Sequence, residues 1–155
     1  MNRTIKFRGK RLGNGEWVYG DLLHINGGCL IYYGSQTKCE LIEGKSDIAV
    51  EMGMDEIAPV DPDTVGQFTR LLDTNGKEIY EGDIITWLTS RGDGMGFMEC
   101  GRVEWRYEEG CYIVVNRFLT RDNREMVRLL IRCTRDIRVR GNIYDNPGLL
   151  KGGAK

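Results

Sequence analysis

The chain has 155 residues, a mass of 17.7 kDa and a formal net charge of -1, with 29% charged and 41% hydrophobic residues. These values are typical of a soluble globular protein, and they exclude a strongly basic nucleic-acid binder and a highly charged disordered chain as descriptions of the whole. The 21 Gly residues, about twice the usual share of ~7%, favour short strands and tight turns over a bundle of helices.

Alternating apolar and polar residues predict short strands along the whole chain. The first two, at 5–11 and 16–23, should form a hairpin. Residues 43–63 are interpreted as an acidic loop, with at most a short strand or helical turn near 49–54. Together the pattern predicts a mainly β fold, in which short antiparallel strands form a barrel-like or sandwich core. The remaining strands are expected at 29–33, 38–42, 65–72, 84–88, 97–107, 111–118 and 137–144.

Two turns have a specific chemistry. Asn75-Gly76 is the strongest hairpin signal, because both residues tolerate the positive φ of a type I′ turn, and we expect a two-residue loop there with Gly76 at positive φ. Gly110 should take the left-handed position of a three-residue loop at 108–110.

Residues 122–133 fit a helix and a strand. Asp122 and Glu125 match a capping box, whereas Val127 and Leu129 begin a strand-like alternation. A row of arginines recurs at helical spacing: Arg121, Arg124, Arg128, Arg132 and Arg135. We favour a short helix here, and a second helical turn that begins at Pro147.

The predicted elements fall into two parts. We expect residues 1–64 to contain the N-terminal hairpins and the acidic loop. Residues 65–150 should form a barrel-like C-terminal part that packs with the first as one compact unit. The tail at 151–155 should fray.

The cysteines and the single histidine do not form a metal-binding pattern. The five Cys residues are scattered without a C-x-x-C pair, and His24 has no partner at zinc-ligand spacing, so we expect neither a metal nor another cofactor. Reduced thiols and the lack of a signal sequence predict a cytoplasmic protein. No run of about 18 apolar residues occurs, so we expect no membrane partner.

Three stretches are more specific than a general β pattern: 5–8 with 17–21, 65–69 running into 75–85, and 141–147. Together they resemble the YopX family of small proteins encoded in phages and prophages. The resemblance implies a mainly β fold, a tendency to form homo-oligomers and no known catalytic residue. It also defines a set of motif residues to which we assign structural roles: Asn75, Gly76, Tyr80, Gly82, Asp83, Gly141, Asn142, Tyr144 and Pro147.

Two groups of residues have the types that catalysis or cation binding would need. Glu78, Glu81 and Asp83 lie within six residues, but we interpret Asp83 as an acceptor of backbone hydrogen bonds at a bend. His24 and Asp21 are an acid/base pair by type, yet the sequence places no nucleophile beside them. We therefore predict a protein without catalytic activity.

Charge is unevenly distributed along the chain. Residues 117–140 hold eight Arg and three acidic residues, a net of +5, whereas residues 40–63 hold eight acidic residues and one Lys, a net of -7. Arg suits carboxylates and phosphates, so we take the five arginines at helical spacing as candidate interface or phosphate contacts, with a solvated face as the alternative.

The function that we predict is a non-catalytic accessory protein of a phage or prophage, which self-associates in the host cytoplasm and has a phage or host protein as a further partner. The alternative is weak, sequence-independent nucleic-acid binding through residues 117–140.

Overall fold

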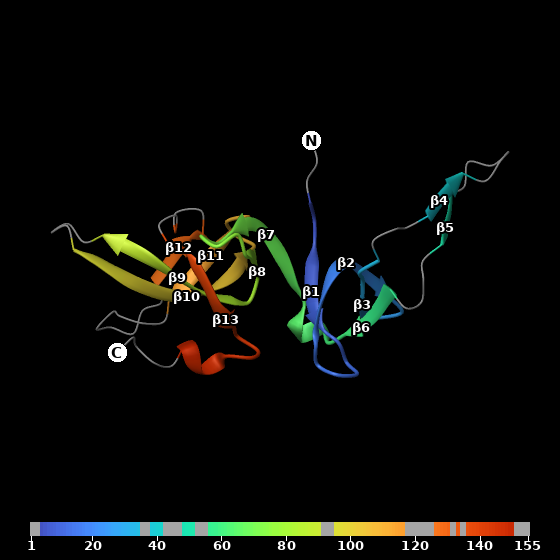
Figure 1. Ribbon diagram of the computed structural model, residues 1–155, viewed down its shortest axis with the longest axis horizontal. Coiled ribbons are helices and arrows are strands. Elements are labelled where there is room, and N and C mark those ends of the chain that lie inside the picture. Colours follow the sequence, from blue (N-terminus) through green and yellow to red (C-terminus); the bar gives the residue numbers. More distant parts are fainter. Residues whose placement is uncertain are drawn as a thin grey trace. The chain divides into compact units, whose positions relative to one another are not determined.

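The computed structural model describes residues 4–34, 38–41, 48–51, 56–90, 95–116, 126–130, 133 and 136–150. The chain divides into two compact units, Met1–Gln67 and Phe68–Lys155. Within the described ranges the protein is mainly β, as predicted, and its strand pairs are antiparallel (Figure 1). None of the described helical segments has the length and apolar character that crossing a membrane demands.

The first unit contains the strands β6-β3-β2-β1-β7, in that order, of a six-stranded sheet. A single bridge joins Arg11 to Val60, but the strands do not close into the barrel that was one of the two predicted cores. Val18, Ile31, Ala58 and Val60 form its buried core. Its strands are β1 (Phe7–Lys10), β2 (Trp17–Ile25), β3 (Gly28–Tyr32), β6 (Ile57–Val60) and the start of β7 (Gly66–Leu72), with a 3-10 turn at Pro62–Thr64.

The predicted N-terminal hairpin is confirmed, since Phe7 pairs with Gly20 and Lys10 with Trp17. Strands β2 and β3 are joined by a two-residue turn, in which Asn26 has a φ of 50° and Gly27 a φ of 80°. Two consecutive positive φ values define a type I′ turn, whose twist matches that of the strands.

Strand β6 lies in the segment that was interpreted as an acidic loop, so that prediction is wrong for residues 57–60. The strand has four residues, and Pro59 within it removes a backbone donor, which a strand at the end of a sheet tolerates. Ala58 and Val60 are nevertheless buried at 3% and 1% exposure. A short strand among acidic residues gives no alternating pattern long enough to recognise.

A separate two-stranded sheet, β4 (Lys38–Leu41) with β5 (Ile48–Glu51), lies within the first of the two chain segments. The strand predicted at 38–42 is thus confirmed. The register pairs Cys39 with Val50 and Leu41 with Ile48. Four apolar residues therefore stand in two cross-strand pairs.

The second unit contains a five-stranded sheet of order β12-β11-β10-β9-β13. Its core gathers Ile79, Ile85, Trp87, Val103 and Val114 with Leu130, Cys133 and Ile137. Beside that sheet, the end of β7 pairs with β8. The strands are β8 (Glu78–Tyr80), β9 (Asp83–Ser90), β10 (Gly96–Arg106), β11 (Cys111–Asn116), β12 (Met126–Leu129) and β13 (Arg138–Asn142), followed by a 3-10 turn at Pro147–Leu150.

The two predicted C-terminal helices are wrong, because the described part of the chain contains only 3-10 turns. Residues 126–129 form strand β12, in which Val127 pairs with Val115 and Leu129 with Ile113. Pairing with β11 gives the backbone of this segment its hydrogen-bond partners, and that tertiary context outweighs the helical spacing of the arginines. The capping residues Asp122 and Glu125 lie outside the described residues. The helical turn at Pro147 is a four-residue 3-10 turn.

The turn between β7 and β8 is longer than predicted. Gly76 has the expected positive φ, at 81°. The Asp73 N–H donates to the Lys77 carbonyl at 2.8 Å and the Gly76 N–H donates to the Asp73 carbonyl at 3.0 Å, so the loop is Thr74–Gly76 and not two residues. This is a three-residue loop that ends in a left-handed glycine. Gly110 is likewise left-handed, with a φ of 61°, in a loop that starts at Tyr107.

Replacing Gly76 by valine should lower the free energy of unfolding by about 1–2 kcal/mol, because a β-branched side chain fits the left-handed region poorly. An added Cβ would meet no atom within 4 Å, so backbone strain is the whole effect. Thermal unfolding of the wild type and Gly76→Val measures it. An unchanged melting midpoint would show that the turn relaxes without cost.

Candidate binding surfaces

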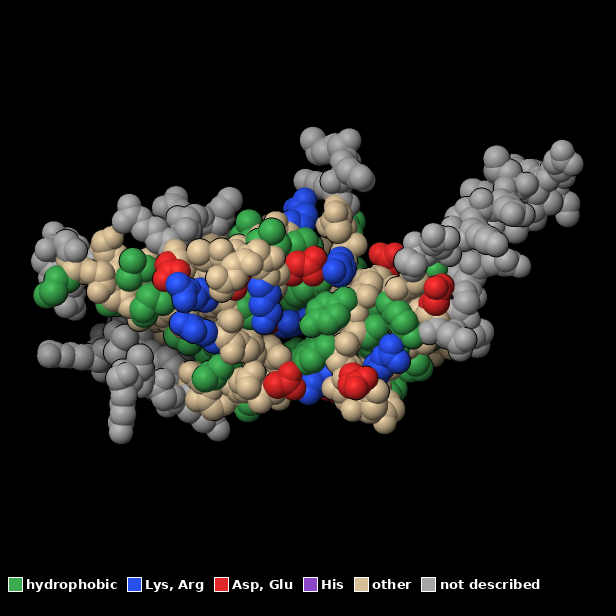
Figure 2. All heavy atoms as spheres, in the orientation of Figure 1, with side chains coloured by type: hydrophobic (Ala, Val, Ile, Leu, Met, Phe, Trp, Pro, Cys, Tyr) green, Lys and Arg blue, Asp and Glu red, His purple; other side chains and the backbone are tan. Residues whose placement is uncertain are grey.

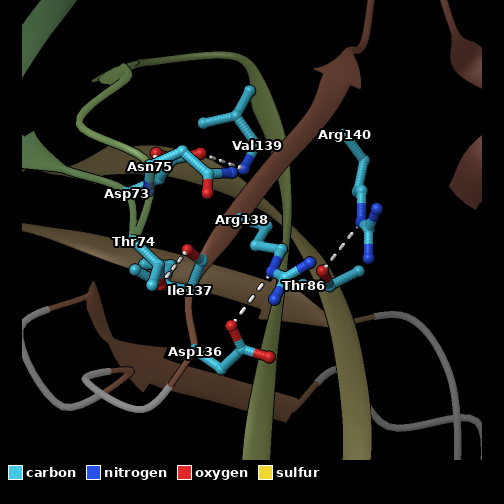
Figure 3. A network of polar contacts seen from close by, with 9 residues as sticks. All are labelled: Asp73, Thr74, Asn75, Thr86, Asp136, Ile137, Arg138, Val139 and Arg140. Carbon is cyan, nitrogen blue, oxygen red and sulfur yellow. Dashed lines mark hydrogen bonds and ion pairs between the residues drawn. The ribbon is translucent and has the colours of Figure 1, made fainter.

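A network of polar contacts ties the β7–β8 turn to β13 (Figure 3). Asp73 is 7% exposed, and its Oδ1 accepts the N–H groups of Asn75 at 2.8 Å and Lys77 at 2.9 Å. Its Oδ2 accepts the Val139 N–H at 3.1 Å. The network therefore holds the turn that carries the motif residues Asn75 and Gly76 against the last strand.

Asp73 titrates below its ordinary range. Burial opposes its ionisation, but the backbone N–H groups of Lys77, Val139 and Asn75 outweigh burial and lower the pKa of Asp73 below 3.8, with a smaller contribution from the Lys77 charge. Next to it, both the N–H and the hydroxyl of Thr74 donate to the Ile137 carbonyl at 2.8 Å. The charged Asp73 carboxylate and the Ile137 carbonyl, which accepts two hydrogen bonds, thus hold the β7–β8 turn in place.

The other motif residues also bond to the backbone near them. Asp83, 1% exposed, accepts the Tyr80 N–H through Oδ2 at 2.8 Å, which is the turn role expected of it. Asn142 Oδ1 accepts the N–H groups of Tyr144 at 2.9 Å and Asp145 at 2.8 Å. Gly82 has a φ of 81°, where an L side chain would be strained. These residues shape turns of the second unit.

The carboxylates considered for cation binding are engaged within the protein. Tyr80 donates its hydroxyl to Glu78 Oε2 at 2.7 Å, and the Trp105 N–H donates to Glu81 Oε1 at 3.4 Å. Across the described ranges, no three His, Cys, Asp or Glu side chains gather where they could hold a metal ion. Asp21 and His24 are both exposed, three residues apart on β2. Their odd spacing places them on opposite faces, so the acid/base pair is not formed.

Most of the predicted arginine contacts lie outside the described residues, namely Arg121, Arg124, Arg132 and Arg135. Arg128 is in β12, paired with Val114. Two further arginines of the basic segment lie on β13. Arg138 Nε contacts Asp136 Oδ1 at 2.9 Å, and Arg140, which sits at a β-bulge, donates from Nε to Thr86 Oγ1 at 3.1 Å. Figure 2 shows basic side chains, with an acidic one beside them, on the face of the second unit seen in that view.

An open groove of ≈ 490 Å³ lies in the second unit, and the sequence analysis did not find it. Trp105 and Tyr112 meet edge to face in its wall, with ring centroids 4.9 Å apart. Burial, together with the charge of Glu81 and against that of Arg70, raises the pKa of Tyr112 to about 12. The groove is lined by Thr69, Arg70, Leu71, Trp105, Gly110, Cys111, Tyr112, Leu129 and Leu130.

Arg70 stands at an irregular point of this groove. It has a φ of 67°, and the β7–β8 register shifts between Phe68 and Leu72. The Thr69 hydroxyl secures both sides of Arg70, because it donates to the Ile79 carbonyl at 2.8 Å and accepts the Leu71 N–H at 3.2 Å. An arginine in the sequence does not indicate a bulge of this kind. The sequence therefore predicted a regular strand at 65–72.

A second surface that sequence reasoning missed is the row of cations and aromatic rings on the first unit. The Arg8 guanidinium lies 4.7 Å and the Lys10 ammonium 5.6 Å from the centroid of the Trp17 ring, and Lys6 lies 5.8 Å from that of Tyr19. Arg8 pairs with Tyr19 and Lys10 with Trp17 across the hairpin. These contacts stabilise the β1–β2 pair.

The protein is thus mainly β and has two units, and the motif residues identified from the sequence form turns of the second unit. The chain matches the model of the YopX protein family over residues 6–151 and therefore belongs to the YopX family. It is similar to the crystal structure of protein EF1440 from Enterococcus faecalis, with a TM-score of 0.57 and 24% identity over 96% of this chain and 99% of that one. At this identity the likeness shows the fold alone. No curated protein sequence matches the chain significantly.

Proposed function

We propose that this member of the YopX family is an accessory protein of a phage or prophage. It acts in the host cytoplasm as a non-catalytic interaction module, and it does so as a homo-oligomer. The observation that carries the proposal is the β4–β5 sheet: within the described ranges these strands pair only with each other, and their register pairs Cys39 with Val50 and Leu41 with Ile48.

A two-stranded hairpin is marginally stable in water on its own. A second copy that packs against the paired apolar residues of β4–β5 would stabilise the sheet by about 25 cal/mol per Å² of apolar surface removed from water. The charges suit the same arrangement, since the -7 of residues 40–63 and the +5 of residues 117–140 are complementary between copies. Exposed ion pairs give only ~0–1 kcal/mol each, so the charges would set the register and the apolar surface the affinity.

Reversing the basic segment should dissociate the oligomer. The triple variant Arg124→Glu, Arg128→Glu, Arg132→Glu places acidic residues opposite the acidic segment, and we expect folded, smaller species on a sizing column. Adding Glu51→Lys, Asp55→Lys and Glu56→Lys should partly restore the larger species. Circular dichroism of each variant checks the fold.

The matched control carries the same change in net charge in the second unit but outside residues 117–140: Lys77→Glu, Arg102→Glu and Arg106→Glu. It should keep the wild-type elution volume. Equal dissociation by the control and the test variant would show that net charge, and not the pairing of the two segments, governs assembly.

The alternative function, nucleic-acid binding through residues 117–140, is tested in the same experiment. A duplex oligonucleotide is added at low and at high salt. Binding through the arginines should be sequence-independent and lost at moderate salt, because it rests on counterion release from phosphates. Sequence-independent binding that is lost at moderate salt would favour this alternative over the interaction module, and sequence-selective binding that survives high salt would contradict it.

A further inference from the structure

We infer that the groove of the second unit binds the C-terminal residue of a partner polypeptide that ends in a large apolar side chain. The inference goes beyond the proposed self-association, because it concerns a different surface and a chain terminus as the ligand. It rests on the apolar walls, on the Arg70 guanidinium and on the Tyr112 hydroxyl, which line one hollow.

The walls of the groove are those of a site for an apolar group. Trp105, Tyr112, Leu71, Leu129 and Leu130 supply aromatic and aliphatic surface. The volume of ≈ 490 Å³ lies within the ~300–1,000 Å³ typical of ligand pockets, which are mostly apolar with a few placed polar groups. The open side leaves room for the rest of a chain to run out.

Arg70 supplies the charge that selects the ligand. Among the residues that the structure describes, its guanidinium has no hydrogen bond or ion pair. The guanidinium offers a planar fork of donors that matches a carboxylate in bidentate geometry. The Tyr112 hydroxyl remains protonated at neutral pH and offers a further donor. Glu81, the acidic group whose charge acts on Tyr112, already accepts the Trp105 N–H.

The backbone at Arg70 is strained, and a glycine at this position would not be. A glycine would adopt the φ of 67° without cost, whereas any other L residue is strained there. Strain of this kind gathers at binding sites. Here it holds a long cationic side chain at the lip of an apolar groove.

A chain terminus fits these two chemistries better than an internal acidic segment. In an extended chain, neighbouring side chains point to opposite sides and the next side chain on the same side starts about 6.4–6.8 Å away, so an internal Glu and an apolar residue enter one hollow only across that distance. A C-terminal residue carries its carboxylate and its apolar side chain on the same Cα. It can therefore meet Arg70 and the apolar wall at once.

The test uses the full chain and a synthetic probe, the acetylated pentapeptide Gly-Gly-Ala-Leu-Phe with a free carboxylate, beside the same peptide as its C-terminal amide. Binding is followed by amide and indole N–H chemical shifts. We expect saturable shifts at Trp105, Gly110 and Cys111 with the acid, and at least a tenfold weaker affinity for the amide. Equal affinities, shifts elsewhere, or no saturable shift would overturn the inference.

Two variants separate binding from folding. Arg70→Gly removes the guanidinium and relieves the strain, so it should weaken the acid peptide at least tenfold without lowering Tm. Lys77→Gly, an exposed residue of the neighbouring turn, is the matched loss of a positive charge and should leave the affinity unchanged. Unchanged binding by Arg70→Gly would overturn the inference. Tighter binding of free 3-phenylpropionate than of the peptide would overturn the assignment to a polypeptide.

Discussion

Replacing Asp73 by alanine should lower the free energy of unfolding by about 3 kcal/mol. The substitution removes a buried carboxylate that accepts three backbone N–H groups, at 2.8, 2.9 and 3.1 Å. Hydrogen bonds to a charged group contribute about 1.5–3 kcal/mol each, and a buried donor left without a partner costs about 1–3 kcal/mol. Urea unfolding measures the loss. Thr74→Ala, which removes one hydroxyl donor to Ile137 on the same turn, is the milder reference at about 1 kcal/mol.

The same residue predicts how stability depends on pH. Because the folded-state pKa of Asp73 is lowered below 3.8, its contribution is fully present above that value and is lost as the pH falls through the folded pKa. Asp73→Asn removes the titrating group. The wild type should therefore lose more stability than Asp73→Asn between neutral pH and pH values below 3.8. Parallel losses in the two proteins would show that other groups govern the acid transition.

Replacing Asn142 by alanine should cost about 2–3 kcal/mol, the second large effect. Asn142 is 9% exposed, and its side chain accepts two backbone N–H groups and donates from Nδ2 to Asp145 Oδ2 at 2.8 Å. Alanine would leave the turn after β13 without its acceptor.

The control for Asn142 is Asp145→Ala. Asp145 is exposed, so the loss of its carboxylate should cost less than about 1 kcal/mol. Thermal unfolding of both variants separates the backbone bonds of Asn142 from its bond to Asp145. Equal destabilisation by the two variants would contradict a role for Asn142 in holding the backbone.

Local turn chemistry could be predicted from the sequence. Gly76 and Gly110 adopt positive φ because their turns require a backbone that glycine reaches without strain. The loop closed by Asp73 was not predicted at its true length. An Asp two residues before an Asn-Gly pair is a known acceptor for backbone N–H groups, and this signal would have identified the longer loop.

Strands β6 and β12 depend on partners that lie far away along the chain, and for that reason their sequences do not reveal them. Strand β6 contains Pro59 and lies among acidic residues. Strand β12 contains Arg128, one of the five arginines at helical spacing. Each becomes a strand because a neighbouring strand offers its backbone groups. Pairing of this kind is set by the tertiary structure and not by local preference.

The groove could not be predicted for the same reason. Its walls come from β7, β10, β11 and β12 together with the β10–β11 turn, and Arg70 enters them through a register shift that leaves no local pattern. The row of arginines at helical spacing, in contrast, was visible in the sequence. Its contact with protein or phosphate stays a prediction.

Sedimentation equilibrium of the wild-type chain tests the central claim most directly. The measurement gives a mass that does not depend on shape, at several micromolar protein concentrations. Self-association predicts a mass that is a whole-number multiple of 17.7 kDa, falling towards the monomer on dilution. A mass of 17.7 kDa at every concentration would contradict the account.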